Sequence, residues 1–146
     1  TVVGTGPQAD ELRALAAGLG AEVEFAGFLT GEALHAAIRS ARALVLPSEC
    51  YENAPMSILE AYALGKPVIA ARIGGIPELI DEPATGLSFP MGDVEALAGA
   101  LSALAAMPDE RVAGMGEAAR QHVERDYSAS VYRERMLAVY REFGVR

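Results

Sequence analysis

Short apolar runs alternate with longer segments of helical periodicity almost to the end of this chain, and this alternation restricts the possible folds more than any other feature. The apolar runs lack the polar alternation of a half-buried strand, so each is predicted to be a strand covered on both faces. Strand–helix repetition of this kind predicts an α/β fold with an open, doubly wound, Rossmann-like parallel sheet. The predicted strands are Val2–Val3, Val23–Phe25, Ala43–Leu46, Val68–Ala71 and Leu87–Phe89.

Capping and breaking residues mark the ends of the predicted helices. One helix is predicted to begin near Ala54 and to end at Gly65, a residue type that suits a helix C-terminus. Asp93 is predicted to cap a later helix. Two C-terminal helices, 109–125 and 128–143, complete the chain, and the last is predicted to bury one apolar side. The side chains on that side are Tyr132, Met136, Val139, Tyr140 and Phe143.

Length, charge and cysteine content narrow the class of protein. The 146 residues, 51% apolar and 22% charged, suit one globular domain over residues 1–146. A net charge of −8 argues against a nucleic-acid surface, which needs clustered cations. The single Cys50, interpreted as a packing residue, fits a reducing, cytoplasmic compartment. A basic face on the last helix, formed by Arg133, Arg135 and Arg141, could make a peripheral contact with the inner face of an anionic membrane.

The loops after the predicted strands are the expected ligand-binding region, because ligands of open α/β sheets lie outside the carboxyl ends of the strands. These loops are Gly4–Pro7, Gly27–Thr30, Pro47–Pro55 and Arg72–Ile76. The first also satisfies G-x-G-x-x-A with Glu24 further on, which leaves open a dinucleotide-binding turn. Pro7 argues against that alternative, because it removes an N–H that would face a pyrophosphate, and favours a plain strand-to-helix turn.

Two carboxylates distinguish the segment from Pro47 to Pro67. Glu52 lies in the loop before the predicted helix, and Glu60 lies about 9 Å along the axis from a helix start near Ala54. Acids this far apart do not act on one atom, but they can hold the two ends of an extended ligand. The helix N-terminus between them offers N–H groups that suit a phosphate. A sugar–diphosphate–ribose molecule has the matching polarity, while two solvated acids remain the simpler alternative.

The same segment resembles the signature of the retaining GT-B glycosyltransferases of group 1, the glycogen-synthase and mannosyltransferase type, whose two glutamates are separated by seven residues (E-x7-E). Further motifs of that family match in the same order over nearly the whole chain. They are Val3–Pro7, Val23–Phe28, Pro47–Ser48, Gly65–Ala70, Gly74–Ile80, Gly86–Leu87, Asp93–Leu97 and Tyr127–Ser128. The resemblance implies the C-terminal, donor-binding domain of a two-domain hexosyltransferase. Such an enzyme uses a UDP-, GDP- or ADP-sugar, retains the anomeric configuration and needs no metal or other cofactor.

The resemblance also implies roles for particular positions. Glu52 would be the catalytic residue beside the hydroxyl groups of the donor sugar, and Glu60 would hold the ribose hydroxyls. The other implied donor-binding residues are Asn53, Ala54, Pro55, Met56 and Ser57 at the sugar and diphosphate, Gly27, Phe28 and Leu29 at the base, and Gly4, Gly6, Gly74 and Gly75 at the border of the cleft. No metal ligand is implied, and His35 and His122 are interpreted as surface or boundary residues.

Two departures from the family pattern matter. The loop from Pro47 to Glu52 has one residue more than the commonest form, with Cys50 where an aromatic residue is usual. The family's Arg and Lys for the diphosphate precede the Val3–Pro7 motif, so the first strand, both cations and the N-terminal domain that binds a sugar, lipid or glycan acceptor are expected outside this sequence. In the family's strand order, 3-2-1-4-5-6, the missing strand is a central one.

The fragment alone is therefore expected to have no transferase activity. Two other functions remain as alternatives. One is a non-catalytic nucleotide-binding or interaction module with the same fold, and the other is an NAD-binding Rossmann domain.

Overall fold

The computed structural model describes residues 1–20 and 22–144 and has the predicted α/β architecture. The contacts divide the chain into two compact units, an N-terminal unit, Thr1–Ala37, and a C-terminal unit, Ile38–Arg146. Every strand pair in the described residues is parallel, as predicted. A single domain over residues 1–146 stays a prediction.

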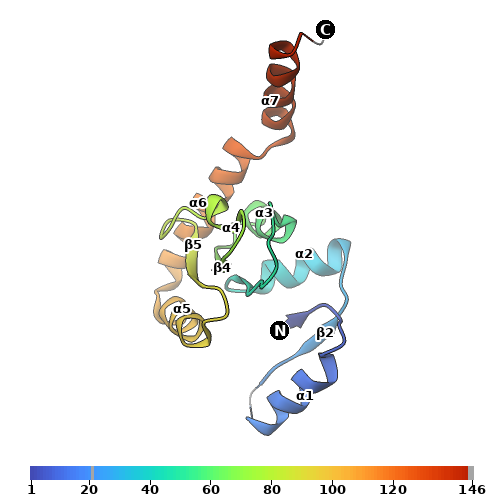
Figure 1. Ribbon diagram of the computed structural model, residues 1–146. Helices are drawn as coiled ribbons and strands as arrows, with labels where there is room; N and C mark the ends of the chain where they lie inside the picture. Colours follow the sequence, from blue (N-terminus) through green and yellow to red (C-terminus); the bar gives the residue numbers. More distant parts are fainter. Residues whose placement is uncertain (21, 145–146) are drawn as a thin grey trace. The chain divides into compact units, whose positions relative to one another are not determined.

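The N-terminal unit holds one parallel strand pair and its connecting helix (Figure 1). Val2 pairs with Phe25 and Val3 with Gly27, so the second strand begins two residues later than predicted. None of the described residues of this unit is buried. The prediction that the strands are covered on both faces is therefore wrong here. The elements are β1 (Val2–Val3), α1 (Ala9–Gly18), β2 (Phe25–Gly27) and most of α2 (Gly31–Ser40).

The C-terminal unit is built on a three-stranded parallel sheet in the order β3-β4-β5. The central strand is buried along Val68 to Ala71 because both of its edges are paired and both of its faces are covered, as its unbroken apolar run predicts. The elements are β3 (Leu44–Leu46), α3 (Met56–Ala63), β4 (Val68–Arg72), α4 (Ile76–Leu79), β5 (Gly86–Pro90), α5 (Val94–Ala106), α6 (Asp109–Asp126) and α7 (Ala129–Glu142). The short helix α4 was not predicted, since four residues show no periodicity.

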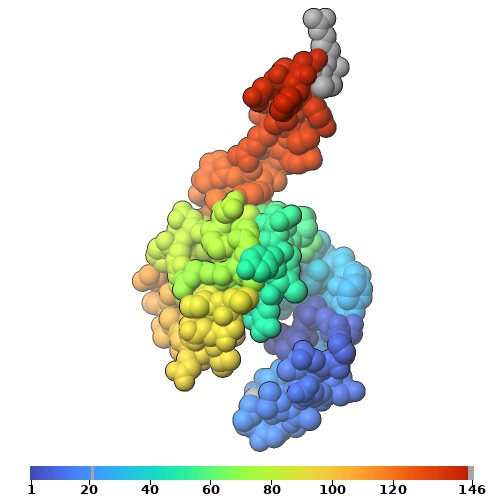
Figure 2. Space-filling model, viewed as in Figure 1, coloured from blue at the N-terminus to red at the C-terminus, as the bar shows by residue number. Residues whose placement is uncertain are grey.

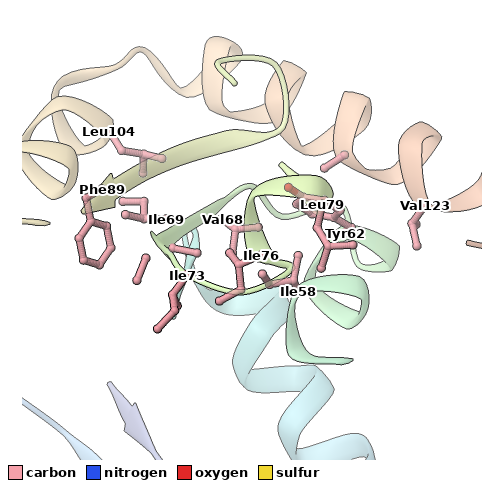
Figure 3. Packing of buried hydrophobic residues seen from close by; sticks show 13 residues of the cluster. Ile58, Tyr62, Val68, Ile69, Ile73, Ile76, Leu79, Phe89, Leu104 and Val123 are labelled. Carbon is pink, nitrogen blue, oxygen red and sulfur yellow. The ribbon is translucent and has the colours of Figure 1, made fainter. Parts of the chain in front are cut away.

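The hydrophobic core lies around β4 (Figure 3). Ile69, Phe89 and Leu104 gather toward α5, while Tyr62 and Leu79 lie toward α6. The main chain of α6 lies close to the main chain that follows α3. A Cβ added to Gly116 would lie only 2.0 Å from the carbonyl oxygen of Gly65. The core therefore fixes α3, the helix that carries Glu60, against both the sheet and α6.

The described strands form two sheets, the pair β1-β2 and the triplet β3-β4-β5. One edge of β3 carries no described strand, and Val45 in that strand is 37% exposed.

The predicted Asp93 cap is confirmed, a second cap is present at Ser128, and one predicted buried face is wrong. The Asp93 carboxylate accepts a hydrogen bond from Ala96 N at 2.9 Å, and Ser128 caps α7 by accepting from Val131 N. By contrast, no residue of α7 is buried. Four of the five side chains predicted to be buried there are exposed, because no other element of this unit packs along α7 (Figure 1). They are Tyr132, Val139, Tyr140 and Phe143.

Candidate functional site

The loop between β3 and α3 carries Glu52, and its own hydrogen bonds shape it. The amide of Cys50 donates to Ser48 Oγ at 3.3 Å, which turns the chain soon after β3 ends. Pro55 has extended backbone, with φ −64° and ψ 120°, and α3 begins after it at Met56. The helix thus starts two residues later than predicted, because a residue before proline is disfavoured in the α region.

The turn after β4 packs directly against the Glu52–Asn53 peptide. Gly75 N donates a hydrogen bond to the carbonyl oxygen of Glu52, with an N···O distance of 2.7 Å. A Cβ on Gly74 would lie 2.3 Å from that same oxygen, and one on Gly75 would lie 1.9 Å from the carbonyl oxygen of Asn53. Two predicted donor-binding glycines therefore lie beside the predicted catalytic residue.

The N-terminus of α3 is open to an anion. No side chain caps the helix. The amides of Met56 and Ser57 donate no hydrogen bond to any described residue, whereas Ile58 N already donates to Pro55 O. Free amides at a helix N-terminus, together with the partial positive charge of the helix dipole, favour a phosphate.

The two glutamates lie on either side of these amides. Glu60 is the fifth residue of α3, so it lies about 6 Å along the axis from Met56, less than the distance predicted from an earlier helix start. Its side chain is half-buried, on the more open side of the helix with Met56 and Ala63. Ile58, Ala61 and Tyr62 form the buried side.

Both carboxylates are unpaired in the described part of the chain. Neither the Glu52 nor the Glu60 side chain makes a hydrogen bond or an ion pair with a described residue, although both side chains are only partly exposed. A carboxylate with reduced solvent contact and no protein partner can accept hydrogen bonds from ligand hydroxyl groups.

The side chains around Glu52 are open to solvent, as Figure 2 shows for this turquoise segment on the surface of the C-terminal unit. Asn53 and Ala54 are exposed, Met56 is 64% exposed, and Pro55 is buried beneath them. Cys50 is also exposed, so its interpretation as a packing residue is wrong. The extra residue of this loop lengthens it at the surface, where no core surrounds the thiol.

The remaining predicted donor residues belong to the N-terminal unit. Gly4 and Gly27 follow its two strands and are joined by a hydrogen bond from Gly4 N to Gly27 O of 2.7 Å. Their φ angles of 125° and 71° explain why glycine stands at both positions. Phe28 is 74% exposed, and Leu29 is partly buried. Gly6 lines an open hollow of about 250 Å³, together with Gly4 and the apolar side chains of Val2, Leu12 and Phe25.

A buried polar contact anchors the far side of α3. Tyr62 Oη lies 2.9 Å from Thr85 Oγ1, and the Thr85 hydroxyl in turn accepts from Asp81 N at 3.0 Å. Burial raises the pKa of the Tyr62 phenol to about 12. The apolar spacing of α3 predicts that Tyr62 faces the core, but its hydroxyl partner is invisible in sequence because Thr85 is distant along the chain.

One cation lies at the carboxyl end of the sheet, at the first position of the predicted ligand-binding loop Arg72–Ile76. Arg72 is the last residue of β4, two positions before Gly74, and its guanidinium donates to Ser88 Oγ at 3.1 Å. Glu82 accepts from the same hydroxyl at 2.7 Å. Lys66 lies beyond the C-terminal end of α3.

No three His, Cys, Asp or Glu side chains among the described residues gather as metal ligands would. None of the described helices is long and apolar enough to cross a membrane.

The chain is similar to known glycosyltransferases in sequence and in structure. It is 36% identical over 141 residues to the GDP-mannose-dependent monoacylated alpha-(1-6)-phosphatidylinositol monomannoside mannosyltransferase of Corynebacterium glutamicum, covering 92% of this chain and 36% of the relative. It superposes on the sucrose-phosphate synthase of Thermosynechococcus elongatus with a TM-score of 0.82 and 29% identity, covering 97% of this chain and 37% of the synthase.

A third comparison concerns the fold alone. HepE of Anabaena, solved in complex with UDP-glucose, superposes with a TM-score of 0.82 at 23% identity, covering 96% of this chain and 40% of HepE. The chain thus spans well under half the length of each of these proteins. The model of the family described as glycosyl transferases group 1 matches residues 1–107. Because this match covers more than half of the chain, and the fold is that of the GT-B glycosyltransferases, the chain belongs to the group 1 glycosyl transferases.

Proposed function

We propose that this chain binds the nucleotide-diphosphate sugar of a retaining hexosyltransferase. In this proposal the diphosphate lies at the amides of Met56 and Ser57, the Glu52 carboxylate faces the hydroxyl groups of the sugar, and Glu60 accepts from the ribose hydroxyls. The observation that carries the proposal is the open N-terminus of α3 between two partly buried, unpaired carboxylates.

The donor class is supported by what the similar proteins bind. The Corynebacterium relative is GDP-mannose-dependent by name, and HepE was solved with UDP-glucose. Both ligands have a hydroxyl-rich sugar and a ribose at opposite ends of a diphosphate. The base would contact Gly27, Phe28 and Leu29, and the cleft would be bordered by Gly4 and Gly6.

The chemistry of this chain would be positioning and charge stabilisation. Amides fixed at the leaving diphosphate lower the energy of the charge that develops there, and they need no reorganisation during the reaction. The acceptor would bind outside the 146 residues, so this chain alone should transfer no sugar. We propose further that binding and transfer need no metal, which predicts unchanged donor affinity in EDTA.

The decisive experiment is a calorimetric titration of the wild-type chain and of Glu60→Ala with UDP, GDP, ADP and their sugars. Glu60→Ala should weaken nucleoside-diphosphate binding by about 1–3 kcal/mol, because hydrogen bonds to a charged acceptor are lost. Glu95→Ala, which removes an exposed acid of α5, is the matched control and should bind as wild type. Equal affinity of Glu60→Ala and wild type would exclude the ribose role, and a preference for NAD would favour the dinucleotide-binding alternative.

A further inference from the structure

We infer that Gly74 and Gly75 are positioning residues that hold the Glu52–Asn53 peptide in place, so that they set recognition of the sugar end of the donor without contacting it. The inference rests on the proposed function, because it concerns how the site for the donor sugar is held. It changes the role of the two glycines from cleft border to support for Glu52.

The contact between the turn and the loop is made by main-chain atoms. Gly75 N donates a hydrogen bond to Glu52 O at 2.7 Å. The bond uses the main-chain carbonyl of Glu52 and does not involve its carboxylate. A Cβ on Gly74 would also lie 2.9 Å from Glu52 N, so the peptide groups on both sides of the Glu52 Cα touch the turn. Gly74 has a φ of 56°, a conformation that residues with a Cβ seldom adopt.

The site of this contact distinguishes it from ordinary close packing. Four glycines of the described chain would bring an added Cβ within 3.0 Å of another atom: Gly74, Gly75, Gly86 and Gly116. Gly86 meets Val68, and Gly116 meets Gly65 and Lys66, all at regions away from the N-terminus of α3. Only the turn at Gly74 and Gly75 meets the residue whose carboxylate is proposed to face the sugar.

The position of the turn also explains why sugar recognition depends on it more than nucleoside recognition does. Glu60 and the first amides of α3 belong to a helix that is fixed by the core and by α6. Glu52 and Asn53 belong to a loop that Gly75 holds at one point and the Ser48–Cys50 turn at another. A shift of this loop moves the Glu52 carboxylate relative to the amides, whereas the amides and Glu60 stay in place.

The test compares Gly75→Ala with Gly116→Ala, whose Cβ would meet a carbonyl oxygen at a similar distance (1.9 Å and 2.0 Å) in the same unit. For each chain, affinity is measured for UDP and UDP-glucose and for GDP and GDP-mannose, and unfolding is followed in urea. We expect Gly75→Ala to lose about tenfold in affinity for the sugar nucleotide relative to its nucleoside diphosphate. Gly116→Ala should be destabilised and should keep the wild-type ratio. The amide resonances of Glu52 and Asn53 should shift in the first variant alone.

A measurement on the wild type covers the case in which Gly75→Ala does not fold. The sugar nucleotide should slow hydrogen exchange of the Gly75 amide at least threefold more than the nucleoside diphosphate does. The reason is that contacts between the sugar and Glu52 should stabilise the hydrogen bond from Gly75 N to Glu52 O. An unchanged affinity ratio in folded Gly75→Ala, or equal slowing by the two ligands, would overturn the positioning role and leave the proposed function intact. A wild type that binds none of UDP, GDP, ADP and their sugars would refute both.

Discussion

The two units of the chain follow the same strand–helix pattern but differ in what covers their apolar residues. In the C-terminal unit β4 is paired on both edges, and the core cluster around it has side chains that are fully buried, including Ile58, Tyr62 and Ile69. In the N-terminal unit the leucines of α1 remain exposed, Leu12 by 45% and Leu15 by 57%. An apolar strand or helix becomes part of a core only when a second layer covers it.

The N-terminus of α3 and the turn at Gly74 and Gly75 belong to the unit with a core. In the N-terminal unit no described residue is buried, Gly27 to Leu29 included.

The largest expected contrast comes from truncating one aliphatic side chain in each unit. Ile69→Ala should lower the free energy of unfolding by about 2–5 kcal/mol, because it removes fully buried methyl groups from the centre of the sheet. Leu15→Ala should change it by less than about 0.5 kcal/mol. Urea unfolding followed by circular dichroism measures both. A cost above about 1 kcal/mol for Leu15→Ala would contradict the contrast between the units.

Tyrosine ionisation at alkaline pH should affect the C-terminal unit, because the N-terminal unit contains no tyrosine. Burial raises the pKa of Tyr62 to about 12. A folded pKa above the unfolded value of about 10 means that the contribution is complete below pH 10 and is lost as the pH rises toward 12. A difference of about two pKa units corresponds to about 3 kcal/mol.

The measurement is urea unfolding between pH 9 and 12 for wild type, Tyr62→Phe and Tyr132→Phe. Tyr62→Phe should cost about 1 kcal/mol near neutral pH through the lost Thr85 contact, and it should flatten the alkaline decline. Tyr132 is 67% exposed and serves as the control, which should follow wild type. A decline as steep in Tyr62→Phe as in wild type would assign the effect to other groups.

The smallest contrast concerns helix caps. Asp93→Ala should cost about 1 kcal/mol, because the bond to Ala96 N is lost at the start of α5. Helix α1 has Gln8 at its N-cap and no capping hydrogen bond, so Gln8→Asp should instead increase helix content in the N-terminal unit. Thermal unfolding and the helical circular dichroism signal measure the two effects. If Asp93→Ala has no cost, the Asp93 cap does not contribute to the stability of the C-terminal unit.

Local signals predicted most of the fold. All five strands, the Asp93 cap and the helices 109–125 and 128–143 could be located because capping chemistry and hydrophobic spacing act over a few residues. The exposure of α1 and α7 could not be predicted, since a helical stripe shows which side is apolar and not what covers it. The start of α3 was misplaced because the effect of Pro55 on Ala54 was overlooked.

The residues of the candidate site were named from the sequence and stay predictions, and the sequence did not show how the site is built. The spacing of Glu52 and Glu60 predicts a helix start between them, and α3 begins between them at Met56. The contact between Gly75 and Glu52 joins segments that lie far apart in the sequence, so no local pattern contains it. Whether each of these residues touches a donor stays a prediction until ligand binding is measured.

The main-chain contacts at the two ends of α3 also bear on how such a protein can change its substrate. Gly75 meets Glu52, and Gly116 meets Gly65, through backbone atoms. These contacts therefore do not depend on which side chains are exposed near the start of α3. Replacements at the exposed Asn53 and Met56 can therefore alter what a ligand encounters while the scaffold stays the same. A library randomised at these two positions would let selection act on specificity with little cost in folding.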